Sequence, residues 1–409
     1  MAKASKRKKP ARKKTPSKQA TYASLTPQLR PRPLKSGVAH IKVVGLGGGG
    51  GNVVSRMMEG DRMRGVEFIA VNTDAQDLNH TIAHHRIYIG KALTHGLGAG
   101  MNPEIGKQAA EENRSEIGEA LHGADIIFLT AGLGGGTGTG AIPIVAEIAR
   151  EKNILTVAIV TKPFTFEGAQ RAAIAQEGLV RLKEKVDALV VIPNDRIFSV
   201  IDKDTPLLKA FGYIDDVLKN AVKAVSELIN VPGIVNVDFA DIAATLKDAG
   251  TTLIGIGIAS GQDRSMKAVN AALSSPLLEV AIDGARGVLF SVAGGRDMKM
   301  SEIHEVAKAV SANLDQNARV IFGAYHDRSL RDKSIKVTVI ATGFSGIFSG
   351  ARLGEPSLFT VPDAPKQVPE PELHAKHRSS SVKDKQPKPP TEDSETWEIP
   401  TFLRKKRGK

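Results

Sequence analysis

The stretch that most constrains the fold is Ala-Gly-Leu-Gly-Gly-Gly-Thr-Gly-Thr-Gly at residues 131–140. It follows an apolar run at 124–130 and precedes a helical pattern at 141–150, with Pro143 expected in the first turn of that helix. Adjacent glycines let backbone N–H groups approach an anion, and the helix dipole and the hydroxyls of Thr137 and Thr139 add to the attraction. A flexible linker is the alternative, but linkers do not separate a buried strand from an amphipathic helix. The sequence therefore predicts a phosphate-binding loop.

A second glycine loop, at residues 45–51, follows a short strand at 41–44 and precedes a helical pattern at 53–58. Gly45, Gly47 and Gly50 satisfy the G-x-G-x-x-G spacing of dinucleotide-binding proteins. Asp74 follows a second strand at 66–71, at roughly the spacing of a ribose-binding acid. An NAD-dependent dehydrogenase is therefore an alternative reading. The G-x-x-x-x-G-K-[ST] pattern of P-loop NTPases does not occur in the sequence, so that class is excluded.

The composition of the 409 residues, 41% hydrophobic and 24% charged, is typical of a soluble protein of two or three domains with a sizeable core. No run approaches the roughly 18 apolar residues of a membrane span. Cysteine is absent, so disulfides and thiolate metal sites are excluded, which fits a reducing cytoplasm. The net charge of +12 comes entirely from residues 1–36, which hold twelve Lys and Arg and no acid. The neutral remainder argues against a nucleic-acid-binding core.

The N-terminal tail, residues 1–38, has few large apolar side chains and is expected to be disordered. It lacks the apolar segment of a secretory signal, whereas its basic, acid-poor composition is compatible with an organellar transit peptide. We favour a bacterial extension. Contact with an anionic membrane or nucleic acid and a merely solvated tail are both open alternatives.

The loop at 134–140, Gly-Gly-Gly-Thr-Gly-Thr-Gly, resembles the signature loop of the tubulin and FtsZ superfamily of GTPases. Residues 41–52, 65–76 and 96–106 are similar to FtsZ segments in the same order, and in that family each is a nucleotide-facing loop. The resemblance covers about 41–344 and the C-terminal peptide. It implies an α/β fold with an N-terminal doubly wound parallel-sheet GTPase domain, a long central helix and a second, smaller α/β domain.

The same resemblance implies which residues contact the nucleotide. Asp74 is expected to help hold hydrated Mg²⁺ on the phosphates, with a turn or N-cap aspartate as the alternative. Glu167 and Arg171 are implied sugar and phosphate contacts, although their i, i+4 spacing would equally give a surface salt bridge. Asn194 is the implied guanine contact, since an amide both donates and accepts. The full set of implied contacts is Gly48, Gly49, Asn52, Asn72, Asp74, Gly98, Ala99, Gly100, Gly134, Gly135, Gly136, Thr137, Gly138, Glu167, Arg171, Asn194, Phe211 and Asp216.

Apolar residues spaced three and four apart from 207 to 229 predict one long amphipathic helix that joins the two domains. Near its start, Phe211 can stack on a base while Asp216 accepts from guanine N1–H and N2–H₂. Adenine lacks this pair of donors, so GTP is the favoured ligand. The adjacent Asp215 leaves a one-residue ambiguity.

Asn236, Asp238 and Asp241 follow the end of this helix and are the candidate catalytic residues. In FtsZ proteins the corresponding loop completes the site of the next subunit in a filament. A carboxylate near the γ-phosphate can orient the attacking water and take its proton. The alternative is capping, with Asp238 or Asp241 as the N-cap of a helix at 242–248.

The second domain is predicted from strands at 253–258, 287–292, 319–323 and 336–342, which alternate with helices at 264–273 and 301–314. It shows no cluster of acid, base and nucleophile. Residues 353–396, rich in Pro, Lys, Glu and Ser, are expected to be a disordered tether. The end of the chain resembles the FtsZ C-terminal peptide that binds membrane tethers and division regulators, and a sticky disordered end is the alternative. Its expected partner-binding residues are Trp397, Ile399, Pro400, Phe402, Leu403 and Arg404.

We therefore expect six segments: a basic tail (1–38), a GTP-binding domain (39–205), a central helix (206–232), an α/β domain with the catalytic loop (233–345), a linker (346–396) and a partner-binding peptide (397–409). The resemblance implies a cytoplasmic, Mg²⁺-dependent GTPase that converts GTP to GDP, polymerises head to tail and forms the division ring at midcell, on the inner face of the membrane. The alternatives are the dehydrogenase and a superfamily relative that polymerises for DNA partitioning or cell shape. The C-terminal peptide favours division over the latter.

Overall fold

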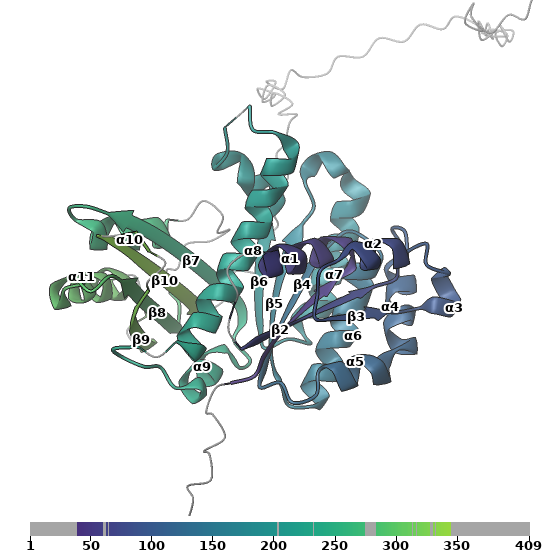
Figure 1. Ribbon diagram of the computed structural model, residues 1–409, viewed down its shortest axis with the longest axis horizontal. Coiled ribbons are helices and arrows are strands. Elements are labelled where there is room, and N and C mark those ends of the chain that lie inside the picture. Colours follow the sequence, from purple (N-terminus) through teal and green to yellow (C-terminus); the bar gives the residue numbers. More distant parts are fainter. Residues whose placement is uncertain are drawn as a thin grey trace, which may run out of the picture. The chain divides into compact units, whose positions relative to one another are not determined.

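The computed structural model describes residues 39–344, apart from 60–62, 64, 203, 232, 275–283, 313, 316, 328–329 and 332. The predicted tail, linker and C-terminal peptide, with its six expected partner-binding residues, lie outside the described residues. Within the described part, the strands form a ten-stranded sheet with the order β3-β2-β1-β4-β5-β6-β7-β10-β8-β9 (Figure 1). Helices flank this mostly parallel sheet, so the predicted α/β class is confirmed.

Six parallel strands form the first part of the sheet. They are β1 (Ile41–Leu46), β2 (Val66–Asn72), β3 (His85–Tyr88), β4 (Ile126–Gly132), β5 (Leu155–Lys162) and β6 (Ala188–Pro193). Strands covered on both faces need apolar residues at nearly every position, which explains the continuous apolar runs found in the sequence. Five of these strands match the predicted ones, and β3 is an additional edge strand.

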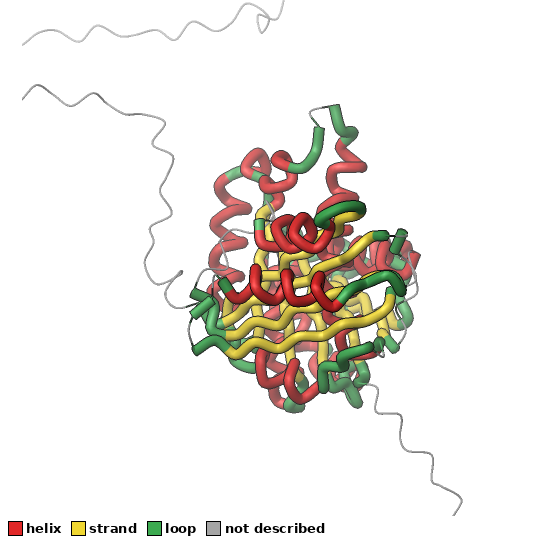
Figure 2. The backbone as a smooth tube through the Cα atoms, turned by 90° about the vertical axis from the view of Figure 1, so that its left-hand side faces the viewer, coloured by secondary structure: helices red, strands yellow, loops and turns green. Residues whose placement is uncertain are grey.

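Helices cover both faces of these strands, and Figure 2 shows the helices in red around the yellow strands of the sheet. Side chains of α5, α6 and α7 pack in the core on one face, together with α4. Those of α1 and α8 pack in the core on the other. The helices are α1 (Gly47–Glu59), α2 (Ala75–His80), α3 (Lys91–Thr94), α4 (Pro103–Glu112), α5 (Arg114–Ala120), α6 (Thr137–Glu151), α7 (Ala169–Lys183) and α8 (Leu207–Asn230), with 3₁₀ turns η1 (Thr165–Glu167) and η2 (Asn194–Ser199).

Helices α1 and α6 begin inside the glycine loops, several residues before the predicted starts, so Pro143 lies in the second turn of α6 and the expected first-turn position is wrong. Glycine disfavours helices, but close packing requires it here. A Cβ on Gly140 would lie 2.0 Å from the Pro103 carbonyl oxygen, and one on Gly106 would lie 2.3 Å from that of Gly136. The backbones of α4 and α6 therefore cross in contact, and tertiary packing overrides propensity.

The second part of the sheet begins with β7 (Gly250–Ser260), which pairs with β6 over two residue pairs and then runs antiparallel to β10 (Ser334–Thr342). Next come β8 (Gly287–Gly294), antiparallel to β10, and β9 (Arg319–His326), parallel to β8. Helices α10 (Arg264–Leu273) and α11 (Met300–Ser311) pack on one face. Helix α9 (Phe239–Leu246) and the end of α8 pack on the other. The predicted strands and helices of this part are confirmed.

Helix α8 runs from Leu207 to Asn230, one residue beyond the predicted end. Its 24 residues span about 36 Å at 1.5 Å per residue. Ile214 and Leu218 belong to the same core cluster as Val54 of α1, and Leu228 packs near β9 at the other end. The helix therefore contacts both parts of the sheet, as Figure 1 shows.

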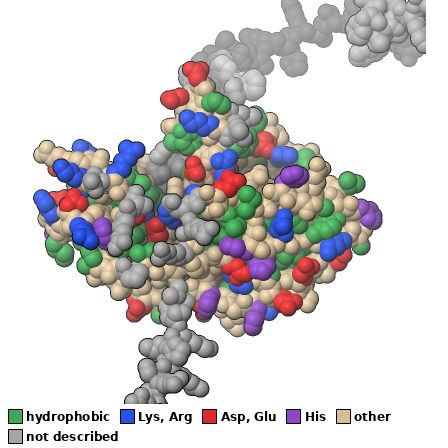
Figure 3. Space-filling view, in the orientation of Figure 1, with side chains coloured by type: hydrophobic (Ala, Val, Ile, Leu, Met, Phe, Trp, Pro, Cys, Tyr) green, Lys and Arg blue, Asp and Glu red, His purple; other side chains and the backbone are tan. Residues whose placement is uncertain are grey.

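The surface of the described residues carries charges of both signs. On the face drawn in Figure 3, Lys and Arg side chains are interspersed with Asp and Glu, in agreement with the neutral composition after residue 36. Of the helices described here, none has the length and apolar character needed to cross a membrane.

Candidate nucleotide site

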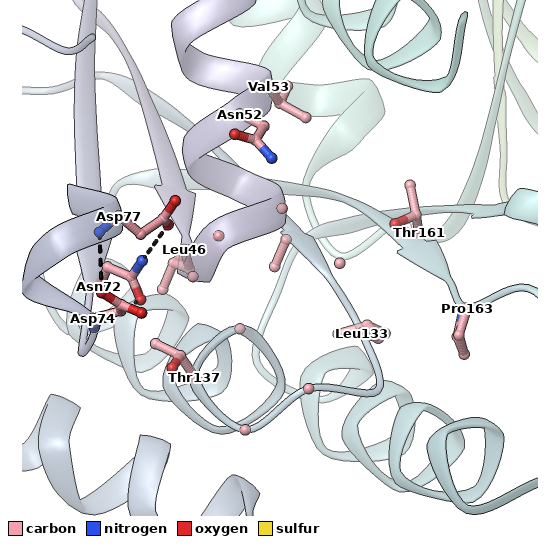
Figure 4. Close-up of a pocket in the computed structure, with 18 of the residues that line it drawn as sticks. Leu46, Asn52, Val53, Asn72, Asp74, Asp77, Leu133, Thr137, Thr161 and Pro163 are labelled. Atoms are coloured by element: carbon pink, nitrogen blue, oxygen red, sulfur yellow. Dashed lines mark hydrogen bonds between the residues drawn. The ribbon is translucent and has the colours of Figure 1, made fainter. Parts of the chain in front are cut away.

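A cavity of about 1080 Å³ lies at the carboxyl ends of the parallel strands, between the loops that follow β1 and β4 (Figure 4). These two strands are neighbours in the sheet, although β2 and β3 lie between them in the chain. The strand order therefore reverses at this point, and open α/β sheets bind their ligands at such a switch point. Both glycine loops found in the sequence line the cavity.

The two glycine loops lead directly into the amino-terminal ends of α1 and α6, where backbone N–H groups lack helical partners. A Cβ on Gly135 would meet nothing within 4 Å, so the backbone there faces open space in the cavity. Thr137 lines the cavity as predicted. Thr139 does not line it, because its buried hydroxyl accepts a hydrogen bond from the Gly134 N–H at 2.9 Å. The structure gives Thr139 a role in shaping the loop, in place of the predicted contact to the anion.

A third loop, at 96–102, closes one side of the cavity. Gly98 and Gly100 have φ values of +81° and +56°, which L side chains rarely adopt, so glycine is required there by the backbone itself. The Gly100 carbonyl accepts from the Gly136 N–H at 2.8 Å and ties this loop to the phosphate loop. The side chain of Asn102 accepts from the Glu104 N–H at 3.0 Å and caps α4, whose predicted start at Pro103 is confirmed.

An acidic corner lies at one end of the cavity, where Figure 4 shows Asn72, Asp74 and Asp77 side by side. Oδ1 of Asp74 accepts from the N–H groups of Gln76 and Asp77, so this aspartate does cap α2 while also lining the cavity. The Asn72 amide donates to Asp77 Oδ2 at 2.7 Å. Burial, with the neighbouring Asp74 carboxylate, raises the pKa of Asp77. Both readings of Asp74 are thus compatible with the geometry.

The opposite side of the cavity carries an ion pair and a cluster of aromatic rings. Arg171 pairs with Glu167, whose other oxygen accepts from the Phe164 N–H at 2.8 Å. Both charged side chains line the cavity, so the predicted surface salt bridge forms within the site. The rings of Phe211 and Phe164 form an edge-to-face pair with 5.6 Å between their centroids, and Phe211 lines the cavity while 40% of it stays exposed.

Asn194 lines the cavity and is almost fully buried. Its Oδ1 has no hydrogen-bond partner among the described residues. Buried polar atoms are nearly always paired, because leaving one unpaired costs about 1–3 kcal/mol. An acceptor in this position is suited to a donor on the ligand.

Helix α8 turns Asp215 toward the cavity and leaves Asp216 exposed and outside the lining. Asp215 pairs with Arg56 of α1, with 2.7 Å between Oδ2 and Nε. Burial raises the pKa of Asp215 to about 6, an effect that Arg56 partly offsets and the charge of Asp216 increases. Of the two adjacent aspartates that the sequence left open, Asp215 is therefore the one that lines the cavity.

The candidate catalytic residues Asn236, Asp238 and Asp241 are all exposed, and none of them lines the cavity. Asp238 occupies the N-cap position of α9, which begins earlier than predicted, but its side chain makes no capping hydrogen bond. Asn236 Oδ1 accepts from the Gly233 N–H at 2.6 Å. The carboxylate of Asp238 is therefore exposed and makes no capping hydrogen bond.

Of the nucleotide contacts predicted from the sequence, all except Gly134 and Asp216 line this cavity. Sequence reasoning missed Arg56 and Asp77, which also line it, and Thr73, whose hydroxyl lies 2.6 Å from that of Thr137. Nothing in the local sequence pattern marks Arg56, because its partner is on another helix. Asp77 lies three residues after Asp74, a spacing that a capping pattern could have revealed.

The fold is a doubly wound α/β sheet with two glycine loops at its switch point. The amino termini of two helices point at one cavity, and an aromatic side chain lies at the edge of that cavity. This combination is typical of a nucleotide-binding protein. Comparisons with known proteins define the class further. Residues 40–202 match the model of the Tubulin/FtsZ family GTPase domain, and residues 250–345 match that of the FtsZ family C-terminal domain.

Solved structures agree with this assignment. An FtsZ structure from M. jannaschii, described as an empty dimer, is 49% identical with a TM-score of 0.70, over 75% of this chain and 88% of that chain. A tryptophan-to-tyrosine mutant of FtsZ from the same organism has the same identity and TM-score, over 75% of this chain and 91% of that chain. CetZ1 from Haloferax volcanii, a GDP-bound monomer, is 24% identical with a TM-score of 0.66, over 75% and 95% of the two chains, and shares the fold. The chain belongs to the FtsZ family, and its first domain is a GTPase domain.

Proposed function

We propose that this chain hydrolyses GTP when it assembles head to tail, with Asn236, Asp238 and Asp241 of one subunit completing the nucleotide site of the next. The observation that carries the proposal is the separation of these residues from the cavity of their own subunit. The residues of α8 that line the cavity end at Leu218, whereas the loop follows the last residue of the helix, Asn230, about 18 Å further along at 1.5 Å per residue. In the acidic corner of the cavity, Oδ1 of Asp74 caps α2 and Oδ2 of Asp77 accepts from the Asn72 amide.

Exposed apolar side chains support a contact between these two ends. Leu97, 87% exposed, stands at the rim of the cavity, and Ile234, 72% exposed, stands beside the catalytic loop. Two different surfaces of one chain that fit each other form a heterologous contact, which continues as a filament when it does not close. The M. jannaschii relative is described as a dimer. Self-association of this chain would bring each loop to a neighbour's phosphates.

Hydrolysis per subunit should rise with protein concentration and be nearly absent at dilutions where no filament forms. Each complete site needs two subunits, so turnover follows the number of contacts rather than the number of chains. Phosphate release measured across a concentration series, with light scattering on the same samples, tests this. Constant turnover per subunit down to concentrations without scattering would contradict catalysis in trans.

Three residues are proposed to read the guanine base. Phe211 stacks on the ring, Asp215 accepts from N1–H and N2–H₂, and the unpartnered Oδ1 of Asn194 accepts a further donor. Adenine presents an acceptor where guanine N1 donates. The half-buried carboxylate of Asp215 would then face another acceptor, and Oδ1 of Asn194 would remain unpaired. A site built to bond a specific polar edge rejects an analogue without it by large factors.

Affinity for GDP should decrease as the pH falls below 6, because Asp215, with its pKa of about 6, must be ionised to accept from guanine. The loss of affinity approaches about tenfold per pH unit below that value. The stability of the nucleotide-free fold changes in the opposite sense. Because the pKa of Asp215 is raised in the folded state, the free energy of unfolding decreases as the pH rises from about 4 to 6. Calorimetry between pH 5 and 7.5 tests this against Asp215→Asn, which retains any titration of the phosphates. Identical pH profiles for the two proteins would contradict the assignment.

Magnesium fits the acidic corner as an ion held mainly by the ligand's phosphates. No group of three His, Cys, Asp or Glu in the described part of the chain is arranged to hold a metal alone. Mg²⁺ keeps several waters and uses one or two carboxylates together with phosphate oxygens. Asp74, with Oδ1 engaged in capping, is proposed to contact its hydration shell through Oδ2. The ion would neutralise phosphate charge during hydrolysis.

The wider cellular role is proposed from family membership and composition. The chain would form the ring at the division site, in the cytoplasm beneath the membrane, with the segments at 39–205, 206–232 and 233–345 acting as GTP-binding domain, central helix and catalytic-loop domain. The peptide at 397–409, reached through the linker at 346–396, would bind membrane tethers and division regulators. The basic tail at 1–38 would contact anionic membrane or nucleic acid.

A further inference from the structure

We infer that three consecutive residues of β9, Gly323, Ala324 and Tyr325, position the catalytic loop for hydrolysis in the neighbouring subunit. The inference rests on the proposed function, because it assumes that Asn236 and Asp238 act on a nucleotide held by another chain. None of the three lines the nucleotide cavity. They are therefore positioning residues that act through the loop.

Ala324 holds the loop by its backbone. Its carbonyl accepts from the N–H groups of Ile234 and Val235 at 2.7 and 3.1 Å, and its own N–H donates to the Val235 carbonyl at 3.1 Å. This bridge adds a short piece of antiparallel pairing to β9 at the end of the sheet order. It fixes the loop immediately before Asn236.

Gly323 leaves room for Val237, the next apolar residue of the loop. A Cβ at this position would lie 3.0 Å from Cγ2 of Val237 and 3.2 Å from Cδ2 of Leu228. Val237 is buried, whereas its neighbours Asn236 and Asp238 are exposed. The absence of a side chain on β9 therefore allows the loop to anchor one residue in the core while the two polar residues beside it face outward.

Tyr325 holds the end of α8, from which the loop starts. Its hydroxyl donates to Oε2 of Glu227 at 2.8 Å, and Lys336 of β10 donates to the same oxygen at 2.7 Å. Tyr325 and Lys336 lie opposite the small, buried Ala293 on either side of β8, so both long side chains can reach the helix. The Glu227 carbonyl accepts from the Val231 N–H at 2.9 Å. The network thus fixes where α8 stops.

This network is well shielded from water, which makes its geometry specific. The side chains of Glu227 and Lys336 are only 15% and 12% exposed, and Lys336 also donates to Asp327 at 3.3 Å. Removing either partner of a buried hydrogen bond between a hydroxyl and a carboxylate costs free energy, because the other partner is left unpaired. Displacing a reacting group by about 1 Å can reduce turnover by about a hundredfold, so small shifts of the loop should be visible in catalysis.

Tyr325→Phe tests the inference, because it keeps the ring and removes the bond to Glu227. We expect GTP affinity within about twofold of wild type, and kcat reduced by about fivefold to a hundredfold in assembled protein. Phe322→Leu is the matched control. Phe322 lies on the same strand but on the other face, stacked on Phe290, so it should change stability without changing kcat per assembled subunit.

Mixing separates a misplaced loop from a damaged nucleotide site. Tyr325→Phe subunits should recover turnover when Gly135→Val subunits, which retain an intact loop, are added. Gly323→Ala provides a second variant if Tyr325→Phe does not fold by circular dichroism. A kcat within twofold of wild type for the folded variant, or a deficit that mixing does not relieve, would overturn the inference. Asp241→Ala in the same assay reports on catalysis in trans by itself, so failure of the proposed function would be recognised separately.

Discussion

Asp241→Ala is expected to bind GTP with nearly wild-type affinity and to hydrolyse it about 10²- to 10⁴-fold more slowly, the usual contribution of a general base. Affinity is retained because Asp241 is exposed and lies outside the cavity of its own subunit. Filaments should persist longer, since removing a negative charge that faces a triphosphate strengthens the contact while turnover falls. Calorimetry, phosphate release and the decay of light scattering measure the three effects.

A mixture of Asp241→Ala with Gly135→Val distinguishes a shared site from a local one. Gly135→Val subunits cannot hold nucleotide in this scheme but still offer an intact Asp241 to a neighbour. Turnover should therefore recover in part when the two nearly inactive variants are combined. Wild-type turnover by Asp241→Ala alone would remove Asp241 from the mechanism.

Gly135→Val is expected to reduce affinity for GTP and GDP by about a hundredfold or more and to abolish assembly with it. The Cβ would project into open space in the cavity, so the fold should tolerate the change while the phosphates are kept away from the backbone. Hydrogen bonds to charged groups are worth about 1.5–3 kcal/mol, so the loss of two is sufficient for such an effect. Calorimetry measures binding, and thermal melting verifies the fold. Gly135→Ala should give a smaller loss of affinity, and equal binding by wild type and the valine variant would refute phosphate binding by this loop.

The sequence predicted those parts of the site that have a local signature. The two glycine loops and α8 were recognised because adjacent glycines and apolar spacings of three and four are patterns within one segment. Strand β3 was missed because only Ile87 among its four residues is buried, so it shows no clear periodicity. The starts of α1 and α6 were missed because glycine hides a helix that tertiary packing imposes.

The choice between Asp215 and Asp216 depends on which side of α8 each residue occupies, and the sequence motif alone does not state this. At about 100° per residue, the fourth residue after Phe211 lies about 40° from it around the helix, and the fifth lies about 140° away. Asp215 thus shares the cavity-facing side of α8 with Phe211, as the structure shows. The pairing of Asp215 with Arg56 could not be predicted, because it joins two helices that are distant in sequence.

Gly135 and Gly136 of the phosphate loop would be kept under selection for different reasons, one for nucleotide binding and the other for folding. A Cβ on Gly136 would lie 2.5 Å from the Gly100 carbonyl oxygen, so any variant there is penalised by folding alone. Gly135 has open space around it and a φ outside the positive range, and alanine at such positions commonly adds about 0.4–1 kcal/mol of stability by restricting the unfolded chain. Directed evolution for thermal tolerance without a demand for nucleotide would accept alanine at Gly135 early, and activity would fall while the melting temperature rose.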